Sequence, residues 1–204
     1  MKDVNKEKRK LLYIHGEFSS FWRDSLKIKS LEKQFDVVGF DYDMEKSFLA
    51  NRDEMVSFCV ENKVDCVIGT SLGCLYAAEI SEKLSLASIL VNPCVKPFEV
   101  LSRAVGTRRN HSTGKEETLT QELVDTYPKT ITLNLLCMVY LELCVTNIDY
   151  RKHLGVFAEA SSVVYSWNDE SGWGDLEQND LFREHFEDFG RKRYGLKSLM
   201  KGED

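Results

Sequence analysis

Short apolar runs alternate with longer amphipathic stretches along the first half of the chain. Each run is rich in Leu, Ile, Val or Phe and ends at glycine or polar residues, which is typical of a buried strand. Four such runs lie at 11–14, 35–40, 65–68 and 86–91. Between them, residues 46–62 and 72–84 carry apolar positions at helical spacing. The pattern predicts strands alternating with helices.

The second half repeats this pattern after an interruption. Residues 135–145 and 161–167 are apolar and predict two more strands, whereas 149–160 and 176–189 have helical spacing. Alternating strands and helices predict an α/β fold of three layers, with a mainly parallel sheet and helices on both faces. The interruption at about 98–130 contains helix-like ends around a polar stretch. We interpret it as a small cap over the strand ends or, alternatively, as a solvent loop.

Composition narrows the classes of function. The 204 residues are enough for one domain spanning 1–204, and the net charge of −6 without a basic stripe argues against a nucleic-acid partner. No apolar segment is long enough for a membrane span or a signal-peptide core, so we expect a cytoplasmic protein with no membrane partner. The six cysteines form no Cys-x-x-Cys pair and lie far from the histidines, which predicts buried free thiols and no metal site.

The run Gly69-Thr70-Ser71-Leu72-Gly73 has the Gly-x-Ser-x-Gly pattern of a nucleophile elbow. It follows a predicted buried strand directly and opens a predicted helix, which is the context that the elbow requires. The turn presents a serine hydroxyl in isolation, and the glycines remove side chains where strand and helix meet closely. We therefore predict Ser71 as a catalytic nucleophile and the backbone N–H of Leu72 as the first oxyanion-hole donor.

A second element of the predicted site is His15-Gly16-Glu17, at the end of the first strand. Hydrolases with a nucleophile elbow take their second oxyanion donor from this loop, which here is the backbone N–H of Glu17. His15 and Gly16 then belong to the binding loop. We expect His15 to shape this loop rather than to transfer protons.

The assembled motifs resemble the YqiA/YcfP-like family of small bacterial α/β-hydrolase esterases. The resemblance covers most of the chain and is strongest over 64–114, where the run Val-Asn-Pro-Cys-Val-Lys-Pro at 91–97 is more distinctive than the elbow. Leu-Tyr-Ile-His-Gly at 12–16 and Asp-Tyr-Arg at 149–151 agree as well. The resemblance implies an esterase acting on short acyl esters with a Ser-Asp-His triad and no cofactor.

The chain departs from this family at both remaining triad positions. Counting along the family pattern places the acid near Val145 and the histidine near Glu170, so both partners of the serine are replaced. Cys74 also stands where the family has a second glycine after the elbow, and the oxyanion loop carries the acidic Glu17. If ionised and close to the oxyanion hole, Glu17 would repel the developing charge.

Other residues could replace the missing partners. Glu170 is a candidate for a direct carboxylate base, although a carboxylate has a low reference pKa and is a weak base unless burial raises it. Further candidates are His111, His153, His185 and, as a displaced acid, Glu142.

Two functions stay open. The first is a serine esterase or thioesterase with a small acyl ester as substrate. The second is a catalytically impaired hydrolase-fold protein that binds a small ligand or a protein partner.

Overall fold

A computed structural model of the protein describes residues 8–142, 153–166 and 184–187. Its centre is a six-stranded sheet in which every neighbouring pair of strands is parallel, in the order β2-β1-β3-β4-β7-β8. These strands are β1 (Lys10–Ile14), β2 (Asp36–Gly39), β3 (Cys66–Thr70), β4 (Ala87–Val91), β7 (Cys137–Glu142) and β8 (Ser162–Ser166). The parallel sheet and the positions of its strands confirm the α/β fold predicted from the apolar runs.

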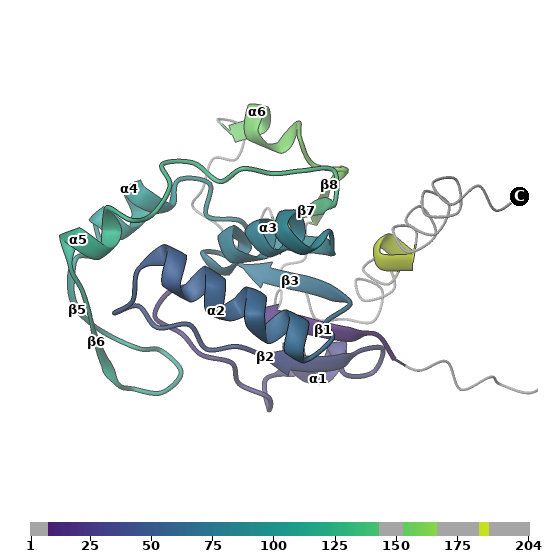
Figure 1. Ribbon diagram of the computed structural model, residues 1–204, viewed down its shortest axis with the longest axis horizontal. Coiled ribbons are helices and arrows are strands. Elements are labelled where there is room, and N and C mark those ends of the chain that lie inside the picture. Colours follow the sequence, from purple (N-terminus) through teal and green to yellow (C-terminus); the bar gives the residue numbers. More distant parts are fainter. Residues whose placement is uncertain (1–7, 143–152, 167–183, 188–204) are drawn as a thin grey trace, which may run out of the picture.

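Helices cover both faces of this sheet (Figure 1). Helices α2 (Phe48–Glu61) and α3 (Gly73–Leu84) pack on one face, and α1 (Leu26–Leu31) lies on the other. Because side chains alternate along a strand, Leu12 joins the core under α2 and α3, whereas Leu11 joins the core under α1. The fully buried strands therefore appear in the sequence as continuous apolar runs rather than as alternating ones.

The insertion after β4 forms a compact unit beyond the carboxyl ends of the strands (Figure 1). It contains α4 (Pro97–Ser102), the antiparallel strands β5 (Gly106–Arg109) and β6 (Glu116–Leu119), and α5 (Gln121–Val124). Leu101, Leu119, Val124 and Tyr127 are buried in the same core as α2 and α3. The insertion is thus packed onto the domain as a cap, not extended as a solvent loop, and its polar stretch is a hairpin that the sequence did not predict.

One helix was not expected, and two of the expected helices are only partly described. Helix α1 was not predicted from the sequence, and α6 (Leu154–Phe157) is the described helical part of the expected 149–160 segment. Of the expected helix at 176–189, the structure describes 184–187, which are helical. No helix in these described ranges is long and apolar enough to cross a membrane.

The two elbow glycines lie where α3 meets the sheet most closely. A Cβ placed on Gly69 would come within 2.5 Å of the Gly73 carbonyl oxygen, and one on Gly73 would come within 2.5 Å of the Ile14 carbonyl oxygen. Both obstacles are backbone atoms, which cannot turn aside as a flexible side chain can. Glycine at these positions is therefore required by the packing of α3 against β1 and β3.

We expect Gly69→Ala to reduce the free energy of unfolding by at least about 3 kcal/mol, because helix and strand must move apart to admit the methyl group. The matched control is Gly155→Ala in α6, where an added Cβ meets nothing within 4 Å. That change should stabilise the protein by up to about 1 kcal/mol or leave it unchanged. Urea denaturation followed by circular dichroism measures both, and equal effects would contradict the close-packing account.

Candidate active site

Ser71 occupies the sharp turn between β3 and α3. Its backbone has a φ of +51°, a left-handed conformation that is uncommon for a residue with a side chain. The turn is held from the β4 side, because the Ser71 N–H donates to the Val91 carbonyl at 3.1 Å and the Ser71 carbonyl accepts from the Cys94 N–H at 3.1 Å. This strained and well-supported geometry is that of a nucleophile elbow.

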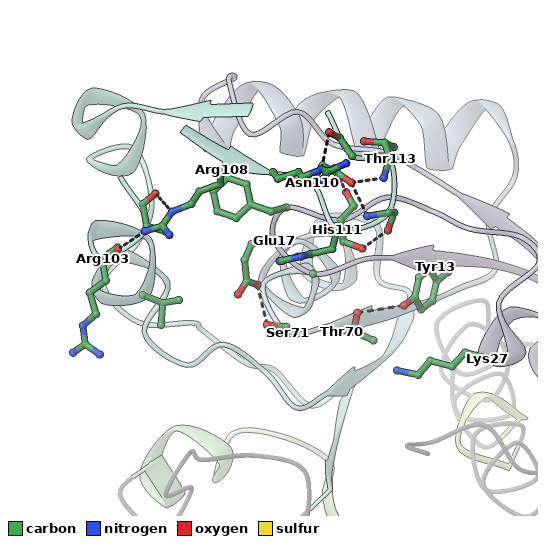
Figure 2. Close-up of a pocket in the computed structure, with 18 residues that line it drawn as sticks. Tyr13, Glu17, Lys27, Thr70, Ser71, Arg103, Arg108, Asn110, His111 and Thr113 are labelled. Atoms are coloured by element: carbon green, nitrogen blue, oxygen red, sulfur yellow. Dashed lines mark hydrogen bonds between the residues drawn. The ribbon is translucent and has the colours of Figure 1, made fainter. Parts of the chain in front are cut away.

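The hydroxyl group of Ser71 is hydrogen-bonded to a carboxylate. Ser71 Oγ donates to Glu17 Oε2 over 3.0 Å, and no other ionisable side chain in the described ranges is hydrogen-bonded to this hydroxyl (Figure 2). Gly16 lets the loop after β1 approach, since a Cβ there would lie only 3.3 Å from Ser71 Cβ. The sequence predicts the backbone N–H of Glu17 as an oxyanion donor, but it does not predict this side-chain contact. The available signal was an acidic residue in this loop, together with the predicted replacement of both triad partners.

Two backbone N–H groups stand beside this pair. The N–H groups of Leu72 and Glu17, predicted as oxyanion donors, have no hydrogen-bond acceptor among the described residues. Leu72 precedes α3, whose first turn has no side-chain cap. Donors without an internal partner at a helix start favour a negative charge nearby.

His15 is buried behind the loop and does not line the cavity. Its Nδ1 bonds the Gly16 carbonyl at 2.7 Å, and its ring stacks on Tyr42 with centroids 4.4 Å apart. Burial lowers the pKa of His15 and outweighs the opposing effects of the Gly16 carbonyl and of Asp41, whose Oδ1 lies 3.4 Å from Nε2. A neutral ring in this position supports the loop through its bond to the Gly16 carbonyl.

The cap hairpin clamps the loop that carries Glu17. Asn110 is almost fully buried, and its Nδ2 donates to the Ser19 carbonyl at 3.0 Å and to Glu117 Oε1 at 2.7 Å. The His111 N–H donates to the Phe18 carbonyl at 2.7 Å, directly after Glu17. Phe18 itself has a φ of +48°. The position of the carboxylate therefore depends on a hairpin almost a hundred residues away in sequence.

A cavity of about 1310 Å³ opens above Ser71 and Glu17 (Figure 2). The loop after β1 and the elbow form one wall, and α4 with the cap hairpin forms the other. Its volume exceeds the 300–1,000 Å³ typical of small-molecule sites, so a small ester fits within it.

The three histidines considered as alternative bases lie in different parts of the structure. His111 lines the cavity with Ser71. His153 lies near α4, where its charge lowers the pKa of Glu99 after the larger effects of Lys96 and Arg103. His185 adjoins Phe186, whose carbonyl is bonded by Arg9 at the opposite end of the sheet. Of the three, the structure brings only His111 to the cavity.

Of the two acidic residues considered as partners of Ser71, the structure describes Glu142 but not Glu170. Glu142 is buried at the end of β7, where Oε2 accepts from Asn92 Nδ2 at 2.6 Å and the Glu142 N–H donates to Asn92 Oδ1 at 2.8 Å. Among the described residues, no hydrogen bond reaches its Oε1. Val145 and Glu170 lie outside the described residues, so Glu170 stays a prediction.

Cysteines near the elbow are buried thiols. Burial raises the pKa of Cys94 to about 12, and the negative charge of Glu17 adds to this effect. Burial likewise raises the pKa of Cys74 well above its ordinary value. Neither is a thiolate at neutral pH, so neither competes with Ser71 as a nucleophile. The structure describes no cluster of three or more His, Cys, Asp or Glu that could hold a metal ion.

The parallel sheet, the elbow at Ser71 and the loop after β1 together define a protein of the α/β-hydrolase fold. The sequence profile of the "Uncharacterised protein family (UPF0227)" matches residues 10–165. The chain belongs to this family, which is the YqiA/YcfP family that its motifs resemble.

Solved structures of hydrolases have the same fold. The Paleococcus ferrophilus monoacylglycerol lipase aligns with a TM-score of 0.63 at 12% identity, over 89% of this chain and 96% of that one. The mouse alpha/beta hydrolase domain-containing protein 10 gives 0.60 at 13% identity, over 94% and 92%. Est1E from Butyrivibrio proteoclasticus gives 0.59 at 11% identity, over 94% and 90%. At these identities the likeness shows the fold.

Removing the clamp at Asn110 should destabilise the protein strongly. We expect Asn110→Ala to cost about 2–4 kcal/mol of unfolding free energy, because it leaves the partly buried Glu117 carboxylate and two backbone N–H groups without their partner. Thr107→Ala, which removes an exposed hydroxyl pair at the other end of the hairpin, should cost less than about 1 kcal/mol. Chemical denaturation measures both, and a loss at Asn110 no larger than at Thr107 would rule out the clamp.

The neutral state of His15 predicts a pH dependence of stability. An unfolded imidazole binds its proton near pH 6.5, whereas the folded protein binds it only at lower pH. The unfolded state then holds more protons, so stability present above about pH 6.5 is lost as the pH falls. Between pH 7.5 and 5.5, wild type should lose up to about 1.4 kcal/mol more than His15→Gln in urea titrations. Equal losses would mean that His15 binds its proton over the same pH range in the folded and unfolded states.

Proposed function

We propose that this protein is a serine hydrolase of the esterase or thioesterase type that acts on a small acyl ester, with Ser71 as its nucleophile. The observation that carries the proposal is the 3.0 Å hydrogen bond from Ser71 Oγ to Glu17 Oε2 at the wall of the cavity. A nucleophilic serine needs a base within hydrogen-bond reach, and Glu17 meets this requirement. The proposal is further supported by the fold shared with a protein named as a monoacylglycerol lipase. It places the activity in the cytoplasm, in agreement with the buried free thiols.

In the proposed reaction, Ser71 Oγ attacks the ester carbonyl while its proton passes to Glu17 Oε2. The negative charge that forms on the carbonyl oxygen accepts hydrogen bonds from the N–H groups of Leu72 and Glu17. The tetrahedral intermediate collapses, and the leaving alcohol or thiol takes the proton from Glu17. Water then attacks the acyl-Ser71 ester, again giving its proton to Glu17, which returns it to Ser71 as the acid is released.

The carboxylate of Glu17 raises an electrostatic question, because two negative charges at one site would repel each other. In the proposed step the two charges do not coexist, since Glu17 becomes neutral when it takes the proton and the oxyanion forms at the same time. The charge moves from one side of Ser71 to the other rather than increasing. This coupling lets one glutamate serve beside an oxyanion hole.

The same contact supports a second candidate, a ligand-binding protein of impaired activity. The Glu17 carboxylate is already hydrogen-bonded to the Ser71 hydroxyl. If it kept its negative charge, it would disfavour the oxyanion. In that case Glu17 holds the serine hydroxyl in place, and a small ligand or protein partner binds without turnover. The two candidates predict opposite effects of removing the charge of Glu17.

Hydrolysis of p-nitrophenyl acetate by the full chain and labelling by a fluorophosphonate probe, read by intact mass, test the proposal. Ser71→Ala should abolish both signals. Glu17→Gln keeps the hydrogen-bond acceptor but not the base, so it should lower kcat by about 10²- to 10⁴-fold while the melting temperature changes little. Glu61→Gln, an exposed acid at the end of α2, is the matched control and should leave kcat unchanged.

Glu170→Gln is measured in the same series, because it shows whether Glu17 or Glu170 acts as the base. Loss of activity in Glu170→Gln but not in Glu17→Gln would assign the base to Glu170 and overturn the role of Glu17. Faster labelling of Glu17→Gln than of wild type would instead show that Glu17 blocks Ser71. Absence of any Ser71 adduct, under conditions that label a control hydrolase, would overturn the hydrolase and leave the binding protein.

A further inference from the structure

The cavity at Ser71 is positively charged, although the chain as a whole is not. Among the described residues that line it, Lys27, Arg103, Arg108 and Arg109 carry positive charge and Glu17 is the only acid. The chain has a net charge of −6. Figure 2 shows Arg103 and Arg108 on one side of the Ser71–Glu17 pair and Lys27 on the other. Cationic residues therefore outnumber acidic ones in the lining of the cavity.

Two of these arginines are held in place by the backbone. Arg108 donates from Nε to the Ala104 carbonyl at 3.4 Å and from a terminal nitrogen to the Arg103 carbonyl at 3.2 Å. Arg109 Nε donates to the Gly114 carbonyl at 3.2 Å. Neutral carbonyls orient a guanidinium without cancelling its charge, so donors remain for an anion.

Neither arginine forms an ion pair with a carboxylate in the described part of the chain. This is unlike Arg23 and Arg52, which pair with nearby acids. Glu116 and Glu117 stand opposite the two arginines in the hairpin register, yet no ion pair joins them, and Glu117 instead accepts from Asn110. The hairpin thus contributes two positively charged residues to the lining of the cavity, each oriented by backbone carbonyls.

We infer that the substrate is an ester that carries a carboxylate or phosphate group, bound by Arg108 and Arg109 while its acyl carbonyl lies at Ser71. The inference rests on the proposed function for turnover, but the anion site itself does not require it. A guanidinium binds both kinds of anion through paired N–H donors. The negative charge of the ligand also complements the positive charges of Arg108 and Arg109, which form no ion pair in the described part of the chain.

Three acetate esters test the inference with the full-length protein: 4-acetoxybenzoate, 4-acetoxyphenyl phosphate and the neutral methyl 4-acetoxybenzoate. The readout is kcat/KM for each anionic ester divided by kcat/KM for the neutral ester. Arg108→Gln and Arg109→Gln should each lower this ratio about tenfold for at least one anion, the size of one hydrogen bond to a charged group. Arg52→Gln, remote from the cavity, should leave it unchanged, and Arg108→Lys should retain most of it.

The two anionic esters show which anion is recognised. A fall in the kcat/KM ratio for only one of them identifies carboxylate or phosphate as the group bound. A ratio that neither glutamine variant changes would overturn the inference. If no ester is turned over, the proposed function fails, and calorimetry with Ser71→Ala decides the anion site separately. Tighter binding of 4-hydroxybenzoate than of 4-hydroxybenzamide, lost in the glutamine variants, supports the site, whereas equal binding overturns it.

Discussion

The candidate site depends on a close approach between the start of α3 and strands β1 and β3. Gly69 and Gly73 remove the two Cβ atoms that would hold helix and sheet apart. With the helix this close, the chain turns within a few residues, and Ser71 takes a positive φ at the carboxyl end of β3. The loop after β1 then lies beside Ser71, because β1 is the sheet neighbour of β3. The geometry around Ser71 thus follows from a steric constraint on the backbone.

The polar groups around Ser71 come from the loop after β1 and from the cap. Glu17 reaches Ser71 from a loop whose next residue, Phe18, is bonded to the cap hairpin. Asn110 joins the same loop to a partly buried carboxylate of the hairpin. A hairpin far away in sequence therefore holds the side chain next to Ser71 in place, and it supplies two of the four cationic residues that line the cavity.

Much of the fold could be predicted because its signals are local. A fully buried parallel strand is a continuous apolar run, and an elbow is two glycines around a serine at a strand end, so β3, α3 and Ser71 followed from the sequence. The hairpin was missed because β5 and β6, with the sequences Gly-Thr-Arg-Arg and Glu-Glu-Thr-Leu, are mostly exposed and show no apolar pattern. The six-residue helix α1 was too short for its periodicity to be detected.

The contact between Glu17 and Ser71 could not be predicted for a different reason. It joins residues 54 positions apart, and it depends on the left-handed turn at Phe18 and on bonds from the cap, neither of which a local pattern encodes. The sequence could indicate only that an acid stood in an unusual place. For the predicted partners near Val145 and Glu170, the family pattern remains the only guide.

The shared core of the cap has a further consequence for how the protein moves. Leu101, Leu119 and Val124 are buried with α2 and α3, and Tyr127 bonds Tyr76 of α3 through their hydroxyl groups at 3.0 Å. A cap joined to the domain in this way cannot swing open as a separate lid without exposing that core to water. Because they share this core, we expect cap and sheet to unfold together as one cooperative unit.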